Sequence, residues 1–124
     1  MKRPRPTFAI VSGCLLLLTT ALLTAVSARD RAPQSREVSI DGDHFTFSPS
    51  RIEVQKDEVV KITFHARDIP HSFALDAYRI VKRAAAGQTV TFEFRADQAG
   101  TFPFYCNLTQ DERCRQMRGE LIVR

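Results

Sequence analysis

The sequence predicts an all-β domain, an antiparallel β-sandwich, preceded by an N-terminal export segment. Beyond residue 36, apolar and polar residues alternate with a period of two in several short runs. Turn residues separate these runs about every ten positions, which is typical of sandwich domains. No segment after the export region keeps a helical period, and no internal repeat is present.

The first 28 residues have the pattern of a secretory signal. Lys2, Arg3 and Arg5 precede an apolar run over residues 8–26, and small residues lead up to a cleavage position after Ala28. The run is also long enough for an uncleaved membrane anchor, which needs roughly 17–25 residues. Both readings predict an exported protein that works in the periplasm or another extracytoplasmic compartment.

Charge and length limit what the exported part can be. The chain has 18 basic and 14 acidic residues, and three of the basic ones lie in the first five positions. The remaining 15 basic and 14 acidic residues leave a net charge of about +1, which excludes a general nucleic-acid surface. Residues 29–36 read as a polar linker, and residues 37–124 are enough for one small domain with a single core.

Four short extended segments are expected in the first half of this domain. They cover residues 37–40, 45–47, 51–55 and 58–65, with turns at 41–43, 48–50 and 56–57. In the fourth segment Val60, Ile62 and Phe64 share one face opposite polar residues. This alternation predicts a half-buried strand.

The second half continues the pattern after an interruption at residues 67–70. Extended segments are expected at residues 72–77, 88–95, 101–106 and 120–123, with a turn at 97–100 and an irregular connection at 78–87. In the segment 101–106, Phe102, Phe104 and Cys106 fall on one side. Cys106 is therefore expected to point toward the core at the end of its strand.

The loop over residues 102–119 carries the residues with the most specific chemistry. Cys106 is followed by Cys114 and then by Met117, just before the last strand. His71 is the best candidate for an imidazole from elsewhere, because it lies between two expected strands behind Pro70. Thiolate, thioether and imidazole form a soft ligand set that favours copper, especially Cu(I).

Other roles for these residues stay open at the level of sequence. Cys106 and Cys114 are the two cysteines left after the export segment, and in an oxidising compartment they can form a disulfide. Zinc at the two cysteines and His71 is chemically admissible. Met117 can act as core filler, while His44 and His65 are expected at the surface, although His44 could supply a missing imidazole.

With these residues in view, the domain resembles the cupredoxin family, secreted copper-binding Greek-key β-sandwiches. The likeness extends over nearly the whole exported part and looks most like the subgroup of cytochrome oxidase subunit II and nitrous oxide reductase. It implies one bound copper ion held by His71, Cys106, Cys114 and Met117. The matching stretches are FTFSP at residues 45–49, DIPHSF at 68–73, GTFPFYC at 100–106 and MRGELIV at 117–123.

The departures from that subgroup fall on the ligands. Its loop typically reads Cys-x3-Cys-x3-His-x2-Met and holds a binuclear copper centre. Here Gln110 stands at the second cysteine's position and Cys114 at the histidine's position. The resemblance therefore implies neither a binuclear centre nor an ordinary blue site with two histidines. It leaves an unusual thiolate-rich mononuclear site.

The resulting functional hypothesis is a monomeric one-electron carrier that serves a redox or copper-handling protein. The alternatives are a Cu(I) carrier or sensor, and a non-metal structural or binding domain with a Cys106–Cys114 disulfide. No nucleophile–base–orienter set is visible, so an enzyme is not predicted. Asp68 is a candidate for orienting His71. Three arginines flank the loop, as a solvated face or as a positive rim that lowers a thiol pKa: Arg113, Arg115 and Arg118.

Overall fold

The computed structural model describes residues 2–4 and 32–124, and from Ser35 onward the chain forms two mixed β-sheets. The smaller sheet contains β1 (Ser35–Asp43), β2 (Thr46–Ser48), β4 (Val59–Ala66) and β7 (Thr89–Arg95). The larger one contains β3 (Arg51–Val54), β5 (His71–Leu75), β6 (Ile80–Ala84), β8 (Gly100–Tyr105) and β9 (Arg118–Val123). A 3₁₀ turn, η1 (Asp76–Tyr78), precedes β6, and a short helix, α1 (Glu112–Gln116), precedes β9.

The order of the strands is β2-β1-β4-β7 in one sheet and β3-β9-β8-β5-β6 in the other. Most neighbouring strands are antiparallel, but β1 runs parallel to β4 and β3 runs parallel to β9. The predicted β-sandwich is confirmed, with one parallel pair in each sheet. Alternation in sequence reports which face a side chain occupies and not the direction of the neighbouring strand, so these pairs could not be foreseen.

The core lies between the two sheets and is rich in phenylalanine. Phe47 and Phe64 come from one sheet, and Phe73 and Phe104 from the other. The rings of Phe73 and Phe104 stack at 4.9 Å between centroids, and Phe47 meets Phe104 edge-on at 5.1 Å. The predicted inward faces of β4 and β8 are confirmed, because Val60, Ile62, Phe64, Phe104 and Cys106 are all fully buried.

Several local predictions differ from the structure. The linker expected over residues 29–36 ends earlier, because β1 begins at Ser35 and pairs with β4. The extended segment expected at 72–77 ends at Leu75, where η1 begins. The connection expected over residues 78–87 contains β6, an edge strand whose side chains are mostly exposed, so it lacks the alternation that marks a half-buried strand. Residues 41–43, expected as a turn, are the end of β1. The turn follows at His44 and Phe45, which adopt positive φ values of 48° and 59°. The loop after β8 contains α1, which is too short to show a helical period.

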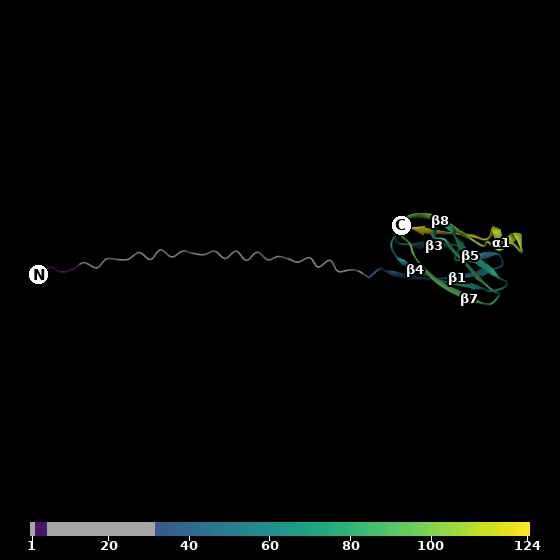
Figure 1. Cartoon of the computed structure of the whole chain (residues 1–124), viewed down its shortest axis with the longest axis horizontal. Coiled ribbons are helices and arrows are strands. Elements are labelled where there is room, and N and C mark those ends of the chain that lie inside the picture. Colours follow the sequence, from purple (N-terminus) through teal and green to yellow (C-terminus); the bar gives the residue numbers. More distant parts are fainter. Residues whose placement is uncertain (1, 5–31) are drawn as a thin grey trace.

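Figure 1 shows α1 at one end of the sandwich and the C-terminus at the opposite end. His71 begins β5, and Cys106 directly follows β8. The residues predicted as ligands therefore come from segments that meet at one end of the larger sheet. Apart from residues 2–4, the predicted export segment lies outside the residues that the structure describes. Within the described part, no helix is long and apolar enough to cross a membrane.

Candidate metal centre

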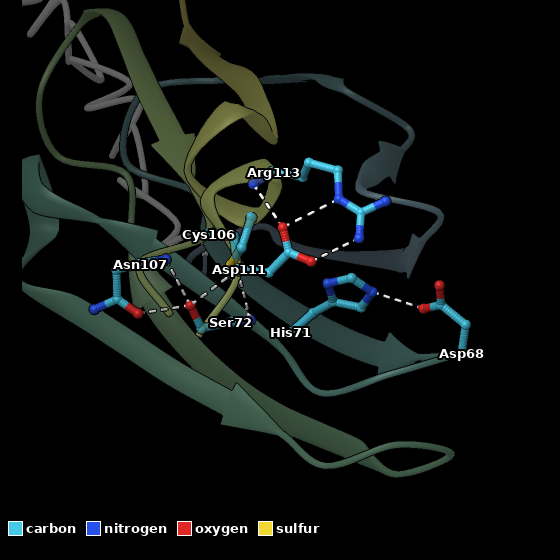
Figure 2. The surroundings of a disulfide bond; sticks show 8 residues. Asp68, His71, Ser72, Cys106, Asn107, Asp111 and Arg113 are labelled. Atoms are coloured by element: carbon cyan, nitrogen blue, oxygen red, sulfur yellow. Dashed lines mark hydrogen bonds and ion pairs between the residues drawn. A yellow bond between two sulfur atoms is a disulfide. The ribbon is translucent and has the colours of Figure 1, made fainter. Parts of the chain in front are cut away.

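His71 is a fully buried imidazole at the start of β5. Its Nε2 atom lies 2.7 Å from Oδ1 of Asp68, one turn earlier in the chain (Figure 2). Gly42 of β1 allows this position, because a Cβ atom there would lie only 3.2 Å from Cδ2 of His71. The edge of the ring also meets Phe45, at 6.0 Å between centroids. The imidazole is thus held from several sides.

Asp68 is an ionised acceptor for this ring. Partial burial raises the pKa of Asp68, but hydrogen bonds from His71 and from the backbone N–H groups of Ile69 and His44 outweigh it, and the pKa falls to about 2. A carboxylate only accepts hydrogen bonds, so Nε2 of His71 carries a hydrogen. The expected orienting contact between Asp68 and His71 is present.

The other ring nitrogen of His71 has no partner. Nδ1 is buried, and among the side chains that the structure describes it is the one buried nitrogen or oxygen without a hydrogen bond. In the neutral tautomer that keeps its hydrogen on Nε2, Nδ1 presents a lone pair. In Figure 2 Asp68 and Cys106 lie on opposite sides of the ring. A lone pair kept in this way is the arrangement of a metal-binding histidine, whose second nitrogen is fixed by a carboxylate.

Cys106 reaches the same region from β8 and is fully buried. Its Sγ atom accepts from the backbone N–H of Ser72 at 3.5 Å and lies 3.6 Å from the Ser72 hydroxyl. That hydroxyl also donates to Oδ1 of Asn107 at 2.6 Å and accepts from the Asn107 N–H at 2.8 Å. Sequence reasoning missed Ser72 and Asn107, because their role depends on β5 lying beside β8.

Cys114 and Met117 return from the loop to Cys106. Asp111 caps α1 by accepting from the N–H of Arg113, and Cys114 is the buried residue of this helix. Cys106 and Cys114 form a disulfide, with 5.3 Å between their Cα atoms. The N–H of Cys106 donates to the carbonyl of Met117 at 3.3 Å, and Met117 is only 1% exposed.

The structure therefore gathers all four predicted ligand residues at one end of the sandwich, and the two cysteines are in the oxidised form. The disulfide that the sequence left open as an alternative is the state described here. A thiolate ligand is available from either cysteine only after this bond is reduced.

The arginines of the loop are exposed, as a solvated face would be. Arg113 pairs with Asp111 at 2.7 Å and lies over the ring of Phe45, 4.3 Å from its centroid. Arg118 lies over the ring of Tyr105 at 5.7 Å. Arg113 is therefore already neutralised by Asp111.

The other two histidines lie outside the centre, as predicted. His44 is in an exposed turn with its Nδ1 2.9 Å from Asp43, and His65 is a half-buried strand residue 3.7 Å from Asp41. The ligand atoms of Asp43, His44 and Asp68 lie within 4.8 Å of one another at the surface. His44 also donates its N–H to Asp68, which links this turn to the His71 side chain.

The comparisons with known proteins agree with this architecture. A family model described as the cupredoxin-like domain matches residues 14–123. The chain belongs to this family. No curated protein matches the sequence of this cupredoxin significantly.

Three solved structures show the likeness of the fold. A chain of a heme-copper terminal oxidase dimer superimposes with a TM-score of 0.68 and 18% identity, over 75% of this chain and 66% of that one. The metal-binding domain of the Cu(I)-exporting ATPase CopA from Streptococcus pneumoniae, solved with Cu(I), gives 0.63 and 18%, over 76% and 90%. The periplasmic domain of cytochrome oxidase subunit II from Bradyrhizobium japonicum gives 0.63 and 16%, over 71% and 83%.

The donors of this cupredoxin fit copper in one oxidation state of the chain. The buried Nδ1 of His71 lacks a partner, and Cys106, Cys114 and Met117 offer buried soft sulfur atoms at the same end of the sandwich. In the disulfide form the set shrinks to one imidazole and one thioether, which is too few for a stable site. In the dithiol form it has the two thiolates that a soft metal prefers.

Proposed function

We propose that this cupredoxin is an exported protein that binds one copper ion in its dithiol form and carries it as Cu(I). The proposed ligands are His71, Cys106, Cys114 and Met117. The observation that carries the proposal is the buried Nδ1 atom of His71, which has no partner although Nε2 is fixed by Asp68. Leaving a buried polar atom unpaired costs about 1–3 kcal/mol, and a ligand to Nδ1 offsets this cost.

The position of the two cysteines favours Cu(I) over Cu(II). Cys106 and Cys114 form a disulfide, with 5.3 Å between their Cα atoms, so the fold accommodates oxidation of the dithiol form. Cu(II) is an oxidant of thiols, whereas Cu(I) is the form that soft thiolates stabilise. A site of this kind suits the transport of Cu(I) better than repeated cycling between the two copper states.

A one-electron carrier is the second candidate, and the burial of the centre favours it. His71 and Cys106 are both 0% exposed, and Asp68 and Ser72 hold them from behind. Copper bound here would supply a one-electron Cu(I)/Cu(II) couple. A rigid site without water changes little between two oxidation states, which is what electron transfer requires.

The cellular setting is part of the proposal. Residues 1–28 act as a signal peptide or an anchor, the residues between them and the start of β1 at Ser35 link this segment to the domain, and the domain works outside the cytoplasm as a monomer. Its partner is a redox or copper-handling protein, and the domain itself is not an enzyme. The disulfide supports this setting, because such bonds persist in oxidising compartments.

Loading of the reduced protein with each copper ion tests the two candidates together. We expect two free thiols after reduction, uptake of one Cu(I), and no stable Cu(II) form in the visible spectrum. Thiolate-to-copper bands that survive redox cycling would instead favour the electron carrier. No copper uptake by the dithiol form would refute both and leave a structural domain.

Two variants make this test specific for the proposed ligands. His71→Ala should lose Cu(I) uptake, whereas His65→Ala, at a histidine outside the centre, should keep it. Cys114→His should gain a stable Cu(II) form with the visible spectrum of an ordinary blue site, which the wild type is expected to lack, if Cys114 occupies the position of a ligand. A variant without such a Cu(II) form would contradict that placement.

A further inference from the structure

The two sulfur atoms of the disulfide face different surroundings. Cys114, itself 3% exposed, lines a surface hollow of about 210 Å³, whereas Cys106 is 0% exposed and is not among the residues that line it. The other residues that line the hollow are Phe45, Ile69, Pro70, Arg83, Leu108, Gln110 and Asp111. Of the two cysteines, a reagent that enters the hollow therefore meets Cys114 first.

The buried sulfur, Sγ of Cys106, accepts a hydrogen bond. The N–H of Ser72 points at Sγ of Cys106 at 3.5 Å, and the Ser72 hydroxyl lies 3.6 Å from the same atom (Figure 2). When a disulfide is cleaved, negative charge develops on the departing sulfur. The Ser72 N–H, which is aimed at that sulfur, stabilises the charge, so the structure favours departure of Cys106 over departure of Cys114.

We propose that Cys106–Cys114 is a directional thiol–disulfide exchange site that takes electrons from a dithiol reductant. A thiolate of the reductant attacks Sγ of Cys114, the Cys106–Cys114 bond breaks, and its electron pair stays on Cys106. The second thiol of the reductant then attacks the reductant sulfur that is bonded to Cys114. This forms the disulfide of the reductant and releases Cys114. Two electrons and two protons pass to the cysteines, and the reductant becomes a disulfide.

The hollow suits such a reductant. Phe45, Ile69, Pro70 and Leu108 form an apolar lining for the groups beside the attacking sulfur. Arg83 is the cation without a carboxylate partner among these lining residues, since the carboxylate of Asp111 is paired with Arg113. An incoming thiolate anion therefore meets favourable charge on its way to Cys114.

This inference does not need copper, and it can fail separately from the proposed function. A chain that binds no metal can still exchange its disulfide as described. A chain that binds Cu(I) can equally be reduced at either sulfur without preference.

The first experiment locates the attacked sulfur. The oxidised full chain is mixed with glutathione, quenched with acid within milliseconds to seconds, alkylated and mapped by mass spectrometry. We expect glutathione on Cys114 and the alkyl group on Cys106. The opposite distribution, or an equal one, would overturn the proposal.

Single-cysteine variants provide a second measurement that does not depend on the disulfide. The thiol of Cys114 in Cys106→Ser should react with a disulfide reagent at least about tenfold faster than the thiol of Cys106 in Cys114→Ser, since burial limits the reactivity of a cysteine. Equal rates would contradict the assignment of Cys114 as the accessible sulfur.

Ser72→Ala tests the role of the donors. The Ser72 hydroxyl donates to Asn107 in the disulfide form, and it lies close enough to turn its hydrogen to Sγ of Cys106 once charge develops there. Its loss should therefore slow the exchange about three- to tenfold, the effect of one modest hydrogen bond. If Ser72 were only structural, its loss would loosen the loop and raise the rate, so an increase would count against the proposal.

The hollow is tested with a matched pair of exposed apolar residues. Ile69→Trp narrows the hollow and should slow the exchange, whereas Val81→Trp, at a residue outside it, should not. Equal rates in both variants would contradict entry through the hollow.

The source of the dithiol is determined with a further variant at the same position, Ile69→Asp. A protein dithiol such as thioredoxin should lose more rate on Ile69→Asp than dithiothreitol does, if the natural reductant docks on the apolar lining. Equal losses indicate a small thiol, with Cys114 still the attacked sulfur.

Discussion

The aromatic core and the candidate metal centre are equally buried but chemically different. Phe64 and Phe104 in the core and His71 and Cys106 in the centre are all 0% exposed. The core rings contact one another, as between Phe73 and Phe104, and they carry no polar atom. The centre places an imidazole nitrogen without a partner beside a disulfide.

The two regions contribute to the free energy of folding with opposite signs. Burial of a phenylalanine stabilises the folded state, because apolar surface leaves water. Burial of Nδ1 of His71 without a partner has the opposite sign. The fold keeps this cost at one end of the sandwich, where Asp68 and Ser72 orient the neighbouring groups. We therefore attribute stability to the core, whereas the candidate centre carries a cost that the proposed ligand would offset.

The largest effect is expected in the aromatic core. Phe104→Ala should lower the free energy of unfolding by about 3–5 kcal/mol, because it leaves a cavity beside the rings of Phe47 and Phe73. Chemical denaturation followed by circular dichroism measures this change. A loss below 1 kcal/mol would show that the ring cluster does not carry the stability assigned to it.

The next prediction contrasts two buried residues of β5. Phe73→Leu should cost about 1–2 kcal/mol through lost packing. His71→Leu should change the free energy of unfolding of the copper-free protein by less than about 1 kcal/mol, since it removes the unpaired Nδ1 together with the hydrogen bond to Asp68. Denaturant titrations of both variants check this. A larger loss for His71→Leu than for Phe73→Leu would mean that the imidazole is structural.

The contact that orients the centre should depend on pH. The pKa of Asp68 is lowered to about 2, so its contribution is fully present above the unfolded value near 3.8 and is lost as the pH falls toward 2. Its side chain is 27% exposed, and after solvent screening we expect about 1 kcal/mol. The difference in unfolding free energy between wild type and Asp68→Asn should reach this value at pH 5 and vanish near pH 2. A difference independent of pH would exclude the carboxylate as its source.

The smallest effect is expected at the start of α1. Asp111→Ala removes the cap that accepts from the N–H of Arg113 and should cost about 0.5–1 kcal/mol. Asp111→Asn keeps an acceptor and serves as the control. Equal stability of the two variants, measured by thermal denaturation, would show that the cap does not hold the loop.

Sequence reasoning predicted the parts of the fold that follow from alternation. Val60, Ile62 and Phe64 mark the inner face of β4 in the sequence and occupy it in the structure. β6 was not predicted, because it is an edge strand with mostly exposed side chains and therefore shows no alternation of apolar and polar residues. The parallel pairing of β1 with β4 joins segments far apart in the chain, and no local pattern specifies it.

The candidate site was predictable in its residue types and not in its supporting contacts. Soft donors in the loop after Cys106 and a histidine behind Pro70 are visible in the sequence. The contact of Ser72 with Cys106 spans 34 residues and depends on the packing of β5 against β8. The choice between thiol ligands and a disulfide is a matter of oxidation state, which residue types alone do not determine.

The most direct test of the account is a Cu(I) competition titration of the same chain in its two oxidation states. The protein with free thiols at Cys106 and Cys114 should take one Cu(I) from a chromophoric chelator, and the disulfide form should take none. Equal binding by both forms would show that the thiols are not ligands. Binding by neither form would contradict a copper site around His71.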